Sequence, residues 1–109
     1  MIWYRVRDLA AGRAFYREQL GFQETLVDGD GRWVRLERGD TIVELLEDEP
    51  AEGGVAIVDV ADVKAEADRL RRAGVRVGVV LELHGQVRLL DVFDPDGNRI
   101  QLTQDIGGA

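Results

Sequence analysis

The sequence predicts an α+β fold in which two βαβββ modules follow one another along the chain. Three observations lead to this prediction. A short β-branched or aromatic run comes just before an aspartate, Asp8 or Asp62, and each aspartate opens a segment of helical periodicity. Each helical segment ends at a glycine, Gly21 or Gly74, a residue that adopts the left-handed conformation of a helix C-terminus at little cost. Three strand-like segments separated by turn residues follow each glycine, so the same order of elements occurs twice.

The first module is expected to span residues 1–47. Its first strand covers residues 2–6, and the helix over residues 9–20 has apolar side chains on one side and most of its charges on the other. Turn residues at 28–31 and 38–40 separate the strands that follow, because glycine and aspartate favour tight hairpin connections. Those three strands are expected over residues 22–27, 32–37 and 41–46.

Residues 48–54 are predicted to be a linker, because acids, a proline and paired glycines interrupt the strand pattern there. The second module is expected over residues 55–104, with a helix from Asp62 to about residue 73. A tail of residues 105–109 is left outside the modules. The 109 residues suit one domain that contains both modules. The strands of the second module are expected over residues 55–60, 75–83, 87–93 and 99–103.

A duplicated βαβββ unit lays its helix on one side of a sheet, and the two sheets are then expected to curl around a common cavity. Because strand side chains alternate, each strand supplies one set of side chains to the helix and one set to the cavity. The helix side is expected to hold Ile2, Tyr4, Val6, Val43, Leu45, Val58, Ile100 and Leu102. The cavity side is expected to hold Trp3, Arg5, Trp33, Arg35, Glu37, Ile42, Glu44, Leu46, Ile57, Asp59, Arg88, Leu90, Gln101 and Thr103.

The composition excludes several classes of protein. The chain has no cysteine, which removes disulfides, thiolate nucleophiles and cysteine-rich metal sites. Its net charge of −7 argues against a nucleic-acid partner, because such binding depends on clustered Lys and Arg. No basic leader with an apolar run begins the sequence, and no stretch approaches the ~20 apolar residues that span a bilayer. No membrane partner is expected, and the predicted location is cytoplasmic.

Three segments resemble the vicinal oxygen chelate superfamily, which includes glyoxalase, extradiol dioxygenases, fosfomycin-resistance enzymes and bleomycin-binding proteins. They are residues 6–9 (VRDL), 15–22 (FYREQLGF) and 94–102 (DPDGNRIQL). Together with the repeat, these segments extend the resemblance over essentially the whole chain. The resemblance implies the glyoxalase/bleomycin-resistance fold. It does not single out one activity, because each matched residue also meets a local structural need of the fold.

In metal-using members, the resemblance implies a ligand on the first strand and the last strand of each module. These positions fall on Met1, Glu44, Val55 and Gln101. Only Glu44 is a customary ligand, and Val55 has no donor atom, so neither a metal nor another cofactor is expected. His84 lies in a predicted hairpin tip and is not expected to replace the missing ligands.

The first function class that these features suggest is a small-molecule-binding protein similar to the bleomycin-binding branch. It would enclose or sequester a planar aromatic or cationic compound, because tryptophan faces and a carboxylate are expected to line the cavity. Within that cavity, Arg5 is a candidate ion-pair partner for Glu44. The expected ligand-binding residues are Trp3, Arg5, Trp33, Arg35, Glu44, Ile57 and Gln101.

Two other function classes stay open at this point. One is a lyase, isomerase or dioxygenase-like enzyme that uses Glu44 as general base, with Arg5 or Arg35 stabilising developing negative charge, or that uses an atypical metal site. The other is a regulatory or oligomerisation domain without a ligand. A homodimer is expected in any of these classes, because exposed sheet edges and a half-closed cavity favour completion by a partner.

Overall fold

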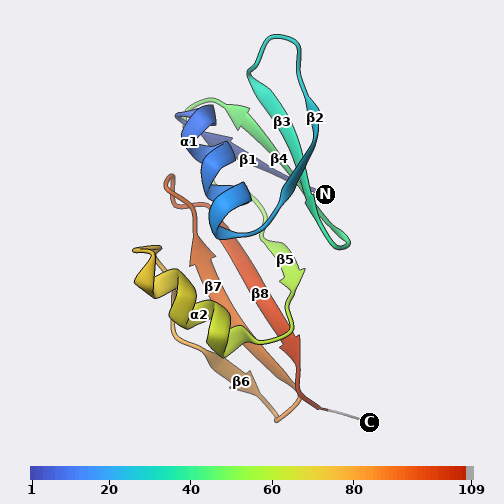
Figure 1. Cartoon of the computed structure of the whole chain (residues 1–109), viewed down its shortest axis with the longest axis vertical. Coiled ribbons are helices and arrows are strands. Elements are labelled where there is room, and N and C mark those ends of the chain that lie inside the picture. The colour runs from blue at the N-terminus through green and yellow to red at the C-terminus, as the bar shows by residue number, and fades with distance from the viewer. Residues whose placement is uncertain (108–109) are drawn as a thin grey trace.

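The computed structural model describes residues 1–107 and contains the expected order of elements (Figure 1). The first module consists of β1 (Ile2–Val6), α1 (Leu9–Ala14), the π-helical segment η1 (Phe15–Gln19), β2 (Gln23–Val27), β3 (Trp33–Arg38) and β4 (Thr41–Glu47). The second module consists of β5 (Ala56–Asp59), α2 (Val63–Arg72), β6 (Leu81–Leu83), β7 (Val87–Phe93) and β8 (Arg99–Asp105).

Each module forms a four-stranded mixed sheet, and the two sheets have equivalent strand orders. The order is β1-β4-β3-β2 in the first module and β5-β8-β7-β6 in the second. The first strand of each module pairs in parallel with the last strand, whereas the other pairs are antiparallel. The α+β fold class and the duplication predicted from the sequence are therefore confirmed.

The helices begin and end where the sequence predicts. The Asp8 carboxylate accepts a hydrogen bond from the Ala11 backbone N–H at 3.2 Å, and Asp62 repeats this contact in the second module. Gly21 and Gly74 have φ angles of 68° and 77°, which an L-residue with a side chain adopts only with strain.

The local structure departs from the sequence prediction in three places. The second half of the first helix is π-helical. The apolar periodicity of the sequence does not distinguish such a short π-helical segment from an α-helix. The predicted strand over residues 75–83 is reduced to β6, because Val77 and Val80 both pack against the core and a spacing of three does not fit strand alternation. Finally, β8 continues to Asp105, inside the predicted tail, and the Ile106 N–H donates to the Gln86 carbonyl. Residues 108 and 109 lie outside the described residues.

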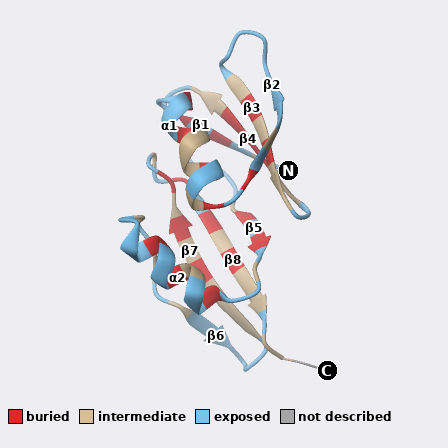
Figure 2. Cartoon of the chain, viewed as in Figure 1, coloured by how far each residue is buried: buried red, intermediate tan, exposed pale blue. Residues whose placement is uncertain are grey.

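Both helices lie on the same side of the sheets, and the buried side chains of the two modules form one cluster beneath them (Figures 1 and 2). The side chains expected on the helix side are buried there, apart from the partly buried Ile2. The molecule is elongated, with extents of 47 × 27 × 23 Å. Neither helix among residues 1–107 has the length and apolar character that a membrane crossing needs.

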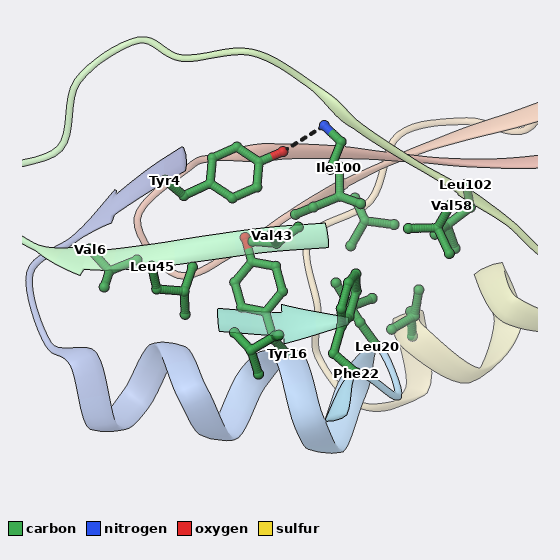
Figure 3. Close-up of a cluster of buried hydrophobic side chains, with 14 of the residues drawn as sticks. Tyr4, Val6, Tyr16, Leu20, Phe22, Val43, Leu45, Val58, Ile100 and Leu102 are labelled. Atoms are coloured by element: carbon green, nitrogen blue, oxygen red, sulfur yellow. Dashed lines mark hydrogen bonds between the residues drawn. The ribbon is translucent and has the colours of Figure 1, made fainter. Parts of the chain in front are cut away.

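Buried tyrosines join the two modules (Figure 3). The Tyr4 hydroxyl accepts a hydrogen bond from the Ala56 backbone N–H at 2.9 Å and donates one to the Arg99 carbonyl. The Tyr16 hydroxyl donates to the Asp94 carboxylate at 2.9 Å. Because both phenols come from the first module and their partners from the second, these contacts set how the modules sit against each other.

Candidate ligand-binding site

The sheet side opposite the helices, called the open face below, carries the polar and aromatic side chains that alternation predicts. In the first module, Trp3 is paired with Glu44 and Arg35 is paired with Glu44 from the other neighbouring strand. Trp33 is paired with Leu46, two residues from the Arg35–Glu44 pair on both strands. Since paired residues of neighbouring strands share a side of the sheet, these five side chains form one surface.

Two tryptophans dominate this surface. The ring centroids of Trp3 and Trp33 lie 6.3 Å apart with an interplanar angle of 37°. Trp3 is 51% exposed, whereas Trp33 is half-buried and its indole Nε1 is buried without a hydrogen-bond partner among the described residues. The guanidinium of Arg35 lies 5.9 Å from the Trp33 ring centroid. A planar group laid on this face would contact aromatic rings together with a cationic edge.

Glu44 is the buried acid of the open face, with 1% exposure. Its Oε2 lies 3.4 Å from the Nε of Arg35. The ion pair between Arg5 and Glu44 considered from the sequence is therefore wrong, because Arg35 stands directly opposite Glu44 on the neighbouring strand, while Arg5 stands opposite Leu46. Arg5 is exposed and has no carboxylate partner within residues 1–107.

A hollow of about 330 Å³ opens at the edge of this surface. Trp3, Arg5 and Leu46 line it from the strands, and residues 51–53 of the linker form its other wall. The linker is not among the site residues that the sequence predicts. Its acid and glycine content marked only a break between modules, and no local pattern indicates which strand a linker will lie against.

The open face of the second module carries a separate polar group. Ile57 is 56% exposed and paired with Gln101, whose Nε2 lies 3.3 Å from the Oδ1 of Asp91. Asp91 is not among the residues predicted for this site. Leu90 and Arg88 of β7 were predicted to lie on the open face, and this prediction is wrong. Leu90 is fully buried under the helix, and Arg88 pairs with Glu82 at 2.6 Å. The sequence did not resolve this strand because two successive leucines leave its alternation ambiguous. Neither Ile57 nor Gln101 lines the hollow beside Trp3.

The four positions at which the resemblance implies metal ligands do not fit a metal ion. Met1 is 67% exposed and Val55 has no donor atom. Glu44 is paired with Arg35, and the Gln101 amide contacts Asp91. No group of three or more His, Cys, Asp or Glu side chains that would hold a metal occurs within residues 1–107. His84 lies exposed at the hairpin tip before β7, with a φ of 53°.

Among solved structures, two of the similar chains come from Streptomyces sp. CB03234. TnmS3, an antibiotic binding protein, is 28% identical with a TM-score of 0.75, and the match covers 94% of this chain and 93% of that one. A glyoxalase/bleomycin resistance protein is 29% identical with a TM-score of 0.76, and the match covers 94% and 96%. The bleomycin resistance determinant encoded on the transposon Tn5 shares the fold at 23% identity and a TM-score of 0.74, with 95% and 94% covered.

No curated protein matches the chain. The family model of the Glyoxalase/Bleomycin resistance protein/Dioxygenase superfamily matches residues 1–102, nearly the full length. With the duplicated βαβββ architecture and its equivalent mixed sheets, this match assigns the family. The chain belongs to the Glyoxalase/Bleomycin resistance protein/Dioxygenase superfamily.

Proposed function

We propose that this protein binds and sequesters a planar aromatic or cationic compound on its open face, without a metal ion. The tryptophan pair is the observation that carries the proposal. Trp3 is half exposed beside Trp33, on a sheet side that no helix covers, and it forms part of the wall of a 330 Å³ hollow. That volume lies at the lower end of the ~300–1,000 Å³ range of small-molecule pockets. Offset stacking on a tryptophan adds about 0.5–1.5 kcal/mol beyond surface burial.

The polar groups around the tryptophans support a ligand that also carries a hydrogen-bond acceptor. The buried Nε1–H of Trp33 has no partner in the described residues, and an unsatisfied buried donor costs ~1–3 kcal/mol. A ligand oxygen or nitrogen that reached this N–H would remove the cost. Arg5 adds exposed donors at the wall of the hollow.

These surroundings support planarity more strongly than positive charge. Arg35 already offsets the carboxylate of Glu44, and the hollow is lined by one basic and one acidic side chain, Arg5 and Glu52. A cation would be attracted mainly through the faces of the tryptophan rings, an interaction of roughly 0.5–2 kcal/mol. We therefore propose a neutral planar compound as the ligand in preference to a cationic one.

A catalytic role for Glu44 receives less support. A general base must come within hydrogen-bond reach of the proton that it removes. The Glu44 carboxylate is 1% exposed and is held by Arg35, so a substrate would have to displace that guanidinium before it reached the acid.

The family relatives support the binding role. TnmS3 is described as an antibiotic binding protein and the Tn5 protein as a bleomycin resistance determinant. We extend small-molecule binding to this chain and leave the compound open, since no residue of the hollow identifies an antibiotic class.

We further propose that the working form is a homodimer. The open face leaves Trp3 and Ile57 half exposed in one chain, and Leu81 and Leu83 of β6 are exposed as well. A second copy placed over this face would cover these side chains and deepen the hollow beside Trp3.

Intrinsic fluorescence provides the test, because Trp3 and Trp33 are the chain's two tryptophans. The protein would be titrated with a panel of cationic, neutral and anionic aromatic compounds of similar size. A binder should alter the tryptophan emission, and Trp3→Phe should weaken its binding about threefold to tenfold, since phenylalanine offers a smaller ring at the same place. Glu44→Gln should selectively weaken cation binding, because it leaves Arg35 as an unpaired positive charge.

Binding confined to anions would contradict the proposal, and cation affinity that Glu44→Gln leaves unchanged would contradict its cationic alternative. Val27→Ala is a matched control, because Val27 is also exposed but is paired with the core-facing Val34 and so belongs to the helix side. That variant should bind the same compounds with unchanged affinity.

The absence of a metal requirement is tested by elemental analysis of the purified protein. We expect far less than one nickel, zinc, iron or manganese ion per chain, and no rise in the midpoint of thermal unfolding when these ions are added. A stoichiometric metal that chelators remove together with ligand binding would overturn the metal-free part of the proposal.

A further inference from the structure

A second hollow, of about 460 Å³, lies on the helix side of the molecule. It occupies the junction between η1, the segment after α2 and the turn after β7, which lie beside one another in Figure 1. None of its lining residues lines the hollow beside Trp3. Its principal lining residues are Phe15, Gln19, Val75, Arg76, Phe93 and Pro95.

Arg76 is the basic group of this hollow. Its guanidinium carbon lies 4.2 Å from the centroid of the Phe93 ring, and the side chain is exposed. Within residues 1–107 it has neither a carboxylate partner nor a side-chain hydrogen bond, so its planar set of donors is directed to solvent while one face rests on the aromatic ring. Such a guanidinium is held in position yet free to receive a carboxylate through two parallel hydrogen bonds.

The surroundings of Arg76 favour an anion although the chain as a whole is acidic, with a net charge of −7. Arg71 donates to the Gly78 carbonyl at 2.9 Å, and neither Arg71 nor Arg72 has a carboxylate partner in the described part of the chain. The one acid that lines the hollow is Asp94. It accepts hydrogen bonds from the Tyr16 hydroxyl, the Asn98 amide and two backbone N–H groups, so its oxygens are already occupied.

The rest of the hollow has a largely apolar and aromatic lining. Phe15 and Gln19 both come from η1, and a π-helical segment of this kind often marks a functional position. Phe15 is partly buried against the core, so its ring is a fixed surface. Val75 and Pro95 add further apolar lining, and Gln19 adds a polar amide.

We propose that this hollow binds a small aromatic carboxylate. The carboxylate pairs with the guanidinium of Arg76, and the aromatic ring lies against Phe15 and the adjoining apolar wall. The site is separate from the open face, so its occupancy does not depend on the proposed function of that face.

The probe is 2-naphthoate, with the neutral 2-naphthylmethanol as its matched compound. Both are titrated into isotopically labelled full-length protein while backbone amide signals are followed by NMR. We expect 2-naphthoate to shift the amides of residues 73–76 and 93–97, and we expect Arg76→Gln to weaken its binding about tenfold through loss of the charge-assisted hydrogen bonds. Because Arg76 is exposed, the variant should keep the fold, which its unperturbed amide spectrum would verify.

Arg72→Gln is the matched control, since it removes the same charge from the last residue of α2, which does not line the hollow. It should change the affinity that the amides of residues 73–76 and 93–97 report by less than twofold. The proposal is overturned by any of three results: Arg72→Gln weakens binding as much as Arg76→Gln, 2-naphthylmethanol shifts the amides of residues 73–76 and 93–97 with the affinity of the acid, or the shifts are confined to residues 1–5, 33–35 and 51–53.

Discussion

At the scale of single residues, the hydroxyl groups of Tyr4 and Tyr16 form hydrogen bonds across the buried junction between the two modules. Each side chain is 1% exposed or less, and each hydroxyl finds its partners in the other module. Burial raises the pKa of Tyr4 to about 12. Burial, with the nearby Asp94 carboxylate, raises the pKa of Tyr16 well above its ordinary value of 10. Both phenols therefore stay neutral in the folded protein at pH values at which the unfolded chain ionises.

The sign of the resulting pH dependence follows from linkage. Below about pH 10 the two tyrosines are neutral in both the folded and the unfolded protein, and their stabilisation is complete. Above this pH the tyrosines of the unfolded protein lose their protons, while those of the folded protein keep them until their raised pKa is reached. The free energy of unfolding should thus fall from pH 10 towards pH 12, by on the order of 1 kcal/mol at pH 11 for Tyr4, with a further fall from Tyr16. Urea denaturation at pH 8 and pH 11 measures this fall.

The variant Tyr4→Phe should be less stable than the parent at pH 8, because the Ala56 N–H and the Arg99 carbonyl lose their partner, yet it should lose less stability between pH 8 and pH 11. An equal fall in the parent and in Tyr4→Phe would refute this account.

At the scale of elements, the strand-to-helix junction is built in the same way in both modules. Asp8 caps α1 and Asp62 caps α2, each through a hydrogen bond to the backbone N–H three residues later. Replacement of either aspartate by alanine should lower the free energy of unfolding by about 1 kcal/mol, as is typical of an N-cap. Chemical denaturation measures the change.

Two further substitutions separate capping from the loss of a charge. Asp62→Asn should keep most of the stability, because asparagine also accepts a hydrogen bond at an N-cap. Asp68→Ala removes an exposed carboxylate from the interior of α2 and should be neutral or slightly stabilising, since alanine is the better helix former. If Asp68→Ala destabilises as much as Asp62→Ala, the hydrogen bond is not the cause.

At the scale of the whole molecule, the open face is the surface that one chain leaves uncovered. Half-exposed apolar side chains occur on it in both modules, with Trp3 in the first and Ile57, Leu81 and Leu83 in the second. We expect sedimentation to give about twice the 12.1 kDa mass of the chain, because pairing of two open faces buries these groups. A monomer at all working concentrations would refute the proposed dimer.

Ile57→Glu should shift this equilibrium towards monomer, since it places a charge where a partner would cover the side chain. The control is Val27→Glu, which introduces the same charge at a residue of similar exposure on the helix side. It should leave the sedimentation unchanged. Equal effects of the two substitutions would show that added charge alone drives dissociation.

The sequence by itself determined the properties that depend on local chemistry. Strand alternation assigned Trp3, Trp33 and Glu44 to the open face, and the capping aspartates and terminal glycines marked the helices. Both properties can be predicted because a strand period or a helix end is set by residues a few positions apart. Where the local signal was ambiguous, at Leu89 and Leu90, the assignment of β7 was wrong.

The tertiary structure alone decided which distant groups meet. It paired Glu44 with Arg35 in place of Arg5, laid linker residues 51–53 beside Trp3, and brought Phe15 towards Arg76 across the module junction. Periodicity states the side of the sheet to which a residue points, but it carries no information on the register between strands or on the placement of one module against another. Those depend on the packing of the shared core and on contacts such as that between Tyr4 and Ala56, which join residues far apart in the chain.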